Sequence, residues 1–552
     1  MKSSNVVKLG GTLFFIGIIF IIYSWNASYP ISIPLLTENI FYSFYPTIWP
    51  GMIFSLVGLF MIAYFSKKTI IKIFCTILFP LILYVPTFFF TYIPSPDSGN
   101  VRGMFQIFNI TGINSPIISY FEFPGYFSLN QVIHKIIGVD EKGVALISFI
   151  LYGILLGLFL YLFFSRFKNE KSLQVIPFLL VFMYFIGLFT YLNYQWAPQT
   201  LALVYFAILI YISTFMLSHP VKIEWNFIFI FLFIPLLFTH AFFPVIFISY
   251  FGILTIKGRQ LFPILIIIIS CYIIWTIYHT TYHFELYLRT FEQSIRGLGL
   301  EYTYSVSRAL QTPSDVLDQL ISVSNRIAIP LIWGIASVGT LILLLKRKIN
   351  YVWISLGVVG FFYLGLGVFY SILGLRAAQI VFIPLTVGFM FFITKWKKLT
   401  IVLIVIILVL SVFGPMRTAY NYTQFQTDEE ACGCNFLATN LTKNPTPMVT
   451  MSQVNWGYFT NKYMSLKNTS RIDFAIRPGT PGFSDTFPPP VYQYNSTLNR
   501  NEYVFYNANL GKEMLIFELT NEQLNTMLGE FKVNNKIYDS GTTFVINGVK
   551  QK

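Results

Sequence analysis

The residues most able to do chemistry lie where the chain leaves a long apolar run, Ile73–Phe90. The next stretch is TYIPSPDSGNVRG, residues 91–103, and its prolines and Gly99 prevent a helix from continuing through it. It contains Asp97, the first aspartate of the chain, and Arg102. A carboxylate at the end of an apolar run can take part in proton transfer, so we interpret Asp97 as an active-site residue. The alternative is that Asp97 only stabilises the turn in PDSG, a position that favours aspartate.

A second stretch between apolar runs, residues 279–325, is also rich in charged side chains. It carries His283, Glu285, Arg289, Glu292, Arg296, Glu301, Arg308, Asp315 and Asp318. The sequence has no phosphate-binding glycine loop, no HExxH and no GxSxG. ATP hydrolysis and zinc or serine hydrolysis therefore lack support.

The elements that must position these groups are membrane spans. The chain has 552 residues, is 55% hydrophobic and 11% charged, and has a mean hydropathy of +0.65, whereas a soluble domain has about a quarter of its residues charged. We predict an all-α polytopic membrane protein of thirteen spans. The predicted spans are Leu9–Tyr23, Ile48–Phe65, Ile73–Tyr92, Val144–Phe164, Leu173–Tyr191, Pro198–Met216, Phe227–Phe238, Phe242–Ile256, Leu261–Tyr278, Ile327–Leu345, Val352–Leu373, Ile380–Ile393 and Thr400–Phe413. The seventh and eighth are short enough to form a re-entrant pair instead.

The net charge of +14 does not indicate a nucleic-acid partner, because the basic residues follow the predicted topology. With the N-terminus inside, the inside segments hold seventeen basic residues and two acids. This is the positive-inside pattern, and it predicts a multi-pass cell-membrane protein with a cytoplasmic N-terminus and an extracytoplasmic tail. Ten of the twelve acids before the tail are then external. A coupled transporter would keep ionisable groups near the midplane, so chemistry at the outer surface fits better.

The chain divides into three predicted parts. Residues 1–69 form a two-span hairpin, residues 70–415 a membrane core with external loops 93–142 and 279–325, and residues 416–552 an extracytoplasmic domain. Within the first loop, SPIISYFEFPGYFSLNQVIHKIIGV has apolar residues at helical spacing and few charges, which suits a helix in the membrane interface.

The tail reads as a small α/β domain. TDEE at 427–430 is typical of a capping box that opens a helix to about Leu441, and a second helix is predicted over Glu522–Phe531. The predicted strands are Met448–Met451, Tyr503–Tyr506, Met514–Leu519 and Thr542–Ile546. Cys432 and Cys434 are either disulfide-bonded or free thiols.

Four motifs, in order, resemble GT-C membrane glycosyltransferases such as protein mannosyltransferases and aminoarabinose transferases. They are Asp97 with FEFPGYFSLNQVIHKIIG at 121–138, YQWAPQTLAL at 194–203, FTHAFFPVIF at 238–247 and GLRAAQIVFIPL at 374–385. The chain departs from the family pattern in its extra N-terminal hairpin. It departs again at His240, which is followed by Ala where His-Pro is expected, and this puts the role of His240 in doubt.

The resemblance implies an inverting sugar transferase of the bilayer. Its donor would be a polyprenyl- or dolichyl-phosphate-linked sugar, and its acceptor a glycan, a lipid or a protein on the outer face. The catalytic candidates are Asp97, which would deprotonate or orient the acceptor hydroxyl, and Glu122, as a second acid. The candidates for binding the departing lipid phosphate are Arg376, Arg102, Arg289, Arg296 and His240. The candidates for sugar or acceptor contacts are Gln195, Gln199 and His283.

Each assignment has a plainer alternative. Glu122 could be a solvated interfacial residue, His240 a polar residue at a tight turn, and Arg376 an anchor that snorkels to headgroups. Gln195 and Gln199 could be ordinary span-end residues.

The function also has alternatives. A polymerase or ligase of lipid-linked glycans, a transporter or flippase, and a sensor that acts through its tail are the competing classes. A divalent metal is an open possibility, but one carboxylate is little support for a site that usually needs two or more oxygen ligands.

Overall fold

The structure is a computed structural model that describes most of the helical part of the chain and five short strands. The described residues are 3–29, 44–89, 101, 105, 108, 123–167, 176–187, 196–218, 223–280, 316–346, 350–366, 371–394, 404, 407, 408, 412, 448–451, 475–478, 502–506, 536–539 and 544–547.

Apolar helices dominate the described part of residues 3–394. They are α1 (Ser3–Ser28), α2 (Ile48–Phe65), α3 (Thr69–Leu83), the 3-10 helix η2 (Val85–Phe89), α5 (Gly125–Ile137), α6 (Glu141–Ser165), α7 (Pro177–Gly187), α9 (Pro198–Ser218), α10 (Ile223–Thr239), α11 (Phe242–Lys257), the 3-10 helix η5 (Arg259–Leu261), α12 (Phe262–His279), α15 (Val316–Leu345), α16 (Tyr351–Leu366) and α17 (Ser371–Thr394). Among the described residues, five helical segments are long and apolar enough to cross a membrane, and seven shorter apolar helices accompany them. These helices make the chain a membrane protein.

The predicted spans up to Ile393 each correspond to a described helix, and α2 has the predicted bounds. The helix of the third predicted span ends earlier than expected. α3 stops at Leu83, and the 3-10 helix η2 follows it. Pro86 explains this difference, since proline has no N–H to donate to the carbonyl four residues earlier and disfavours α geometry in the residue before it. The predicted span Thr400–Phe413 lies largely outside the described residues. Its four described members are Ile404, Ile407, Leu408 and Val412, all buried.

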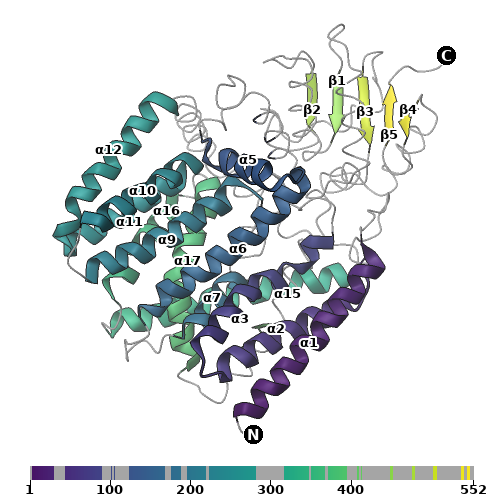
Figure 1. The fold of residues 1–552 in the computed structure, drawn as a ribbon, viewed down its shortest axis with the longest axis horizontal. Coiled ribbons are helices and arrows are strands. Elements are labelled where there is room, and N and C mark those ends of the chain that lie inside the picture. The colour runs from purple at the N-terminus through teal and green to yellow at the C-terminus, as the bar shows by residue number, and fades with distance from the viewer. Residues whose placement is uncertain are drawn as a thin grey trace.

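Consecutive spanning helices run in opposite directions between two ends of the bundle (Figure 1). We call one the α5 end, defined by Gly125, Trp196, Phe238 and Arg376, and the other the pocket end, defined by Lys68, Arg166, Lys257 and Asn350. The described N-terminus lies at the pocket end, and the strands lie beyond the α5 end (Figure 1).

The pair α10 and α11 illustrates this alternation. Gly125 of α5 packs on Phe238 near the end of α10, and a Cβ at Gly125 would lie 3.1 Å from the Phe238 backbone. At the other end of α11, the Lys257 ammonium lies 5.9 Å from the Tyr351 ring. The end of α10 therefore lies at the α5 end and the end of α11 at the pocket end.

Small residues allow the closest helix contacts. A Cβ at Gly17 of α1 would lie 2.5 Å from the Gly51 carbonyl oxygen of α2, and a Cβ at Gly339 of α15 would overlap the Gly388 carbonyl of α17. Such contacts bring helix backbones together where lipid offers no hydrophobic driving force. Elsewhere the interior is aromatic, as where Phe79 of α3 stacks on Phe182 of α7 at 3.8 Å.

The outermost helices leave apolar side chains uncovered. On α1, Phe15 is 70% exposed and Ile19 59%, and on α12, Ile274 is 57% exposed. A soluble protein rarely leaves such continuous apolar surface open, whereas lipid chains satisfy it.

The described strands form one mixed five-stranded sheet. They are β1 (Met448–Met451), β2 (Ala475–Pro478), β3 (Glu502–Tyr506), β4 (Lys536–Asp539) and β5 (Phe544–Asn547), in the order β2-β1-β3-β5-β4. β1 pairs in parallel with β2 and β3, whereas β5 is antiparallel to β3 and β4. β1 has its predicted bounds, β3 begins one residue early, and β5 begins two residues late and ends one residue late, while β2 and β4 were not predicted. The predicted strand Met514–Leu519 and both tail helices lie outside the described residues.

Candidate functional site

Helix α5 organises the α5 end of the bundle, where it contacts α6 and α10 (Figure 1). It lies within the stretch for which the sequence predicts an interfacial helix. It ends at Gly138, which has a φ of 73°, the left-handed conformation that glycine adopts without strain. Tyr126, Phe127 and Asn130 on one face are buried. The opposite face exposes the apolar side chains Val132 and Ile136, and this division suits a helix in the membrane interface.

A buried hydrogen-bond network centred on Asn130 fixes α5. The Asn130 Oδ1 accepts bonds from Ser148 Oγ of α6 at 2.5 Å and from Trp196 Nε1, just before α9, at 3.2 Å. Its Nδ2 donates to the Tyr126 carbonyl at 2.8 Å and to the Tyr152 hydroxyl of α6 at 3.4 Å. One amide thus joins three elements, and buried polar groups of this kind are costly to leave unpaired.

Sequence reasoning missed this residue. The available signal was a lone asparagine on the apolar face of α5, four residues after Tyr126 and therefore on the same side of the helix. Burial raises the pKa of Tyr126 well above its ordinary value, so its phenol stays protonated beside Asn130.

Part of the first long loop is held against α5. Val101, Phe105 and Phe108 are helical and buried, at the spacing i, i+4, i+7 of one helix face. The Phe105 ring lies edge-on to His134 and to Trp196, each at 6.1 Å, and the Phe108 ring lies 5.7 Å from Phe127. Asp97 precedes the first of these anchors by four residues in the sequence.

His240 lies between α10 and α11 at the α5 end. Its Nδ1 accepts a hydrogen bond from the Phe242 N–H at 3.1 Å, which satisfies one of the free amides at the start of α11. Its ring also lies edge-on to Phe243 at 5.2 Å. Because Nδ1 is an acceptor here, a neutral ring carries its proton on Nε2. His240 therefore has a structural role at the start of α11.

Arg376 lies further inside a helix than the sequence suggested. The predicted span began at Ile380, whereas α17 begins at Ser371, so Arg376 lies in its second turn. The side chain is half-buried, and its Nε is buried without a hydrogen-bond partner among the described residues. Three residues later, the Gln379 carbonyl accepts a bond from the Tyr184 hydroxyl of α7 at 3.3 Å, which ties this part of α17 to α7. A buried guanidinium N–H without a partner is costly, and an anion would satisfy it.

The structure describes only some of the candidate site residues. Gln199 lies in the first turn of α9 and is buried, three residues from Trp196. The candidates outside the described residues are Asp97, Arg102, Glu122, Gln195, His283, Arg289 and Arg296. Their roles stay predictions.

The described part of the chain contains no group of three or more His, Cys, Asp and Glu residues that could hold a metal ion. The carboxylates best placed in the sequence to be ligands, Asp97 and Glu122, are outside it, so we assign no step to a metal. What the described residues offer at the α5 end is an unpaired guanidinium N–H, an imidazole and a helix whose apolar face is open.

Comparison with known proteins adds no family assignment, since no protein-family model matches the chain and no curated protein matches it either.

Proposed function

We propose that the protein is a membrane glycosyltransferase that moves a sugar from a polyprenyl-phosphate-linked donor to an acceptor at the outer face of the membrane. The proposal rests on the resemblance of four sequence motifs to GT-C enzymes. The structural observation that carries it is Arg376, a cation at the α5 end whose buried Nε has no hydrogen-bond partner among the described residues. A guanidinium in that state is suited to a phosphate oxygen, which it can bind through more than one N–H.

The proposed orientation places the α5 end outside. The described basic residues of the pocket end are Lys8, Lys67, Lys68, Lys72, Arg166, Lys257, Arg259 and Lys346. Such an excess is expected of cytoplasmic segments. In this orientation residues 400–413 form a thirteenth span, and the strands near the C-terminus belong to an extracytoplasmic α/β domain.

Donor binding would use both the apolar surfaces and the cation of the α5 end. The lipid chain would lie against uncovered apolar helix faces, and the phosphate would lie near Arg376. The starts of α9, α11 and α17 also lie at this end, and helix N-termini add partial positive charge that favours an anion. Binding the phosphate there would favour its departure as the leaving group.

In the transfer step, the acceptor oxygen attacks the anomeric carbon and the bond from that carbon to the phosphate oxygen breaks. The bonding electrons remain on the phosphate, and Arg376 stabilises the charge that develops there. The acceptor proton passes to the Asp97 carboxylate as general base. Attack opposite the leaving group inverts the anomeric configuration. Products are the glycosylated acceptor and polyprenyl phosphate.

The experiment is transfer from a panel of radiolabelled polyprenyl-phosphate sugars by the full chain in proteoliposomes, with and without a chelator. Arg376→Lys keeps the charge but loses the planar fork, so donor binding should weaken by about 10- to 100-fold, the value of one charge-assisted hydrogen bond. Lys67→Ala removes a positive charge from the exposed turn at the pocket end and should bind donor like the parent.

The outcome separates a binding residue from an anchor. If Arg376→Lys and Arg376→Ala both bind donor like the parent, Arg376 is only a span anchor. If no donor of the panel is consumed by the folded parent protein, the glycosyltransferase proposal is wrong.

A further inference from the structure

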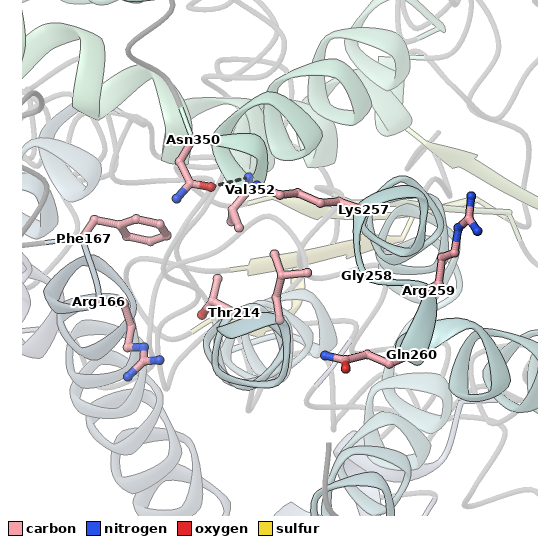
Figure 2. A pocket seen from close by; sticks show the side chains of 10 residues that line it. Arg166, Phe167, Thr214, Lys257, Gly258, Arg259, Gln260, Asn350 and Val352 are labelled. Carbon is pink, nitrogen blue, oxygen red and sulfur yellow. Dashed lines mark hydrogen bonds between the residues drawn. The ribbon is translucent and has the colours of Figure 1, made fainter. Parts of the chain in front are cut away.

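At the end of the bundle opposite the proposed active site, the helix ends enclose a pocket of about 620 Å³. Four segments form it: the end of α6, the last turns of α9, the connection from α11 to η5, and the start of α16. The lining residues are Arg166, Phe167, Thr214, Leu217, Lys257, Gly258, Arg259, Gln260, Asn350 and Val352 (Figure 2). Its size lies within the roughly 300–1,000 Å³ of small-molecule sites.

The described charged side chains of the pocket all have the same sign. Among the described lining residues, three are Arg or Lys and none is acidic. Figure 2 shows Arg166 on one side and Lys257 on the other, with Gln260 extending between the helices, while Arg259 points away. An anion is therefore the expected type of ligand.

In the part of the chain that the structure describes, aromatic rings rather than carboxylates lie against the two facing cations. The Arg166 guanidinium lies 5.1 Å from the Phe215 ring, and the Lys257 ammonium lies 5.9 Å from the Tyr351 ring. A cation over an aromatic face is oriented but keeps its full charge, and its N–H groups at the edge can still donate to a ligand. Arg166 and Lys257 are thus oriented by their aromatic neighbours and keep their positive charge.

Two large apolar side chains are exposed beside the pocket. Ile256, directly before Lys257, is 72% exposed, and Phe262, directly after η5, is 54% exposed. Two large apolar side chains beside a basic pocket match a ligand that has an anionic head and an apolar tail. A water-soluble phosphate would gain nothing from them.

Gly258 lies at the turn of this wall. A Cβ there would lie 2.7 Å from Leu217 Cδ1, so the turn after α11 packs closely against a side chain at the end of α9. The Gly258 N–H donates to the Leu254 carbonyl at 3.0 Å, and its own carbonyl accepts from the Leu261 N–H at 2.8 Å. These bonds fix the loop that presents Lys257 and Gln260.

We propose that this pocket binds a phosphate-bearing group, the headgroup of an anionic phospholipid of the surrounding bilayer. The phosphate lies between Arg166 and Lys257, and the acyl chains lie along Ile256 and Phe262. This site is separate from the proposed donor site and does not depend on the proposed glycosyl transfer.

The test is lipid retention by the purified full chain, measured by native mass spectrometry after reconstitution with phosphatidylglycerol and phosphatidylcholine. The parent should retain phosphatidylglycerol in preference. The double variant Arg166→Gln/Lys257→Gln should lose that preference by roughly 100-fold, at about tenfold for each charge-assisted hydrogen bond to the phosphate. The control Lys67→Gln/Lys68→Gln removes the same charge from an exposed turn at the same end and should retain the lipid within about threefold.

Three results would overturn the proposal. Equal losses of lipid in both double variants would show only a general attraction to the basic surface, and full retention by the pocket variant would show that the pocket does not bind the lipid. Displacement of the lipid by millimolar inorganic phosphate would show that a soluble phosphate is the ligand. Circular dichroism of each preparation confirms that the variants compared are folded.

Discussion

Replacing Asn130 by alanine should be among the most damaging single changes at the α5 end. The substitution removes the shared partner of Ser148 and Trp196, together with the bonds to Tyr126 and Tyr152. The Ser148 hydroxyl can rotate toward another acceptor, whereas the fixed Trp196 N–H cannot. A buried polar group left without a partner costs about 1–3 kcal/mol, and hydrogen bonds between membrane helices average about 0.6 kcal/mol. The free energy of unfolding should therefore fall by about 2–4 kcal/mol.

The assay is equilibrium unfolding in mixed micelles, titrated with sodium dodecyl sulfate and followed by far-ultraviolet circular dichroism. Gln131→Ala, the half-buried neighbour on the same helix, is the control and should change the unfolding free energy by less than about 0.5 kcal/mol. Trp196→Phe removes the stranded donor itself. In the double variant Asn130→Ala/Trp196→Phe, the free energy of unfolding should fall by about 1 kcal/mol less than the sum of the losses in the two single variants.

Equal unfolding free energies for Asn130→Ala and Gln131→Ala would refute the network. Simple additivity of Asn130→Ala and Trp196→Phe would refute the direct bond between those two side chains, even if each variant were destabilised.

Three further predictions concern catalysis, packing and topology. Asp97→Asn removes a proton acceptor at nearly constant volume, so turnover should fall by roughly a hundredfold or more with donor binding retained; near-normal turnover would reduce Asp97 to a turn residue. Gly339→Val should force α15 away from Gly388 and lower the unfolding free energy by about 1–3 kcal/mol in the same titration; parent-like unfolding would contradict the close contact. Impermeant maleimide should label Cys432 or Cys434 in intact cells after reduction, and complete protection would place the tail inside.

Most of the helices could be predicted from the sequence, and the least predictable feature was where each one ends. Ile48–Phe65 is uniformly apolar and bounded by charged or polar residues, so its limits were readable. The third span was predicted too long, because its apolar character continues past Pro86 although its α-helical geometry stops at Leu83. Hydropathy reports what a segment can bury, whereas the end of a helix depends on a few backbone hydrogen bonds. In the sheet, β2 and β4 were missed because AIRP contains arginine and proline, and KIYD contains lysine and aspartate, a composition that strands disfavour.

For the candidate site, the sequence supplied candidates and the structure supplied their surroundings. Arg376 and His240 were candidates from the sequence and both lie at the α5 end, but the half-buried state of Arg376 and the contact of His240 with the start of α11 depend on surrounding helices. Asn130 was missed because its importance comes from Ser148 and Trp196, which are 18 and 66 residues away in the chain. Asp97 and Glu122 lie outside the described residues and stay predictions.

The sequence by itself determined that this is a membrane protein of alternating apolar helices with its basic residues concentrated at one end, because burial in lipid and the charge of loops are properties that each segment carries alone. Only the tertiary structure decided which polar atoms are joined through Asn130 and that Arg376 keeps a buried N–H without a described partner. It also decided that Arg166 and Lys257, which are 91 residues apart in the sequence, line the same pocket. The physical reason is that hydrogen bonds and electrostatic pairing act over a few ångströms, so they depend on which helices pack together, and local sequence does not encode that distance.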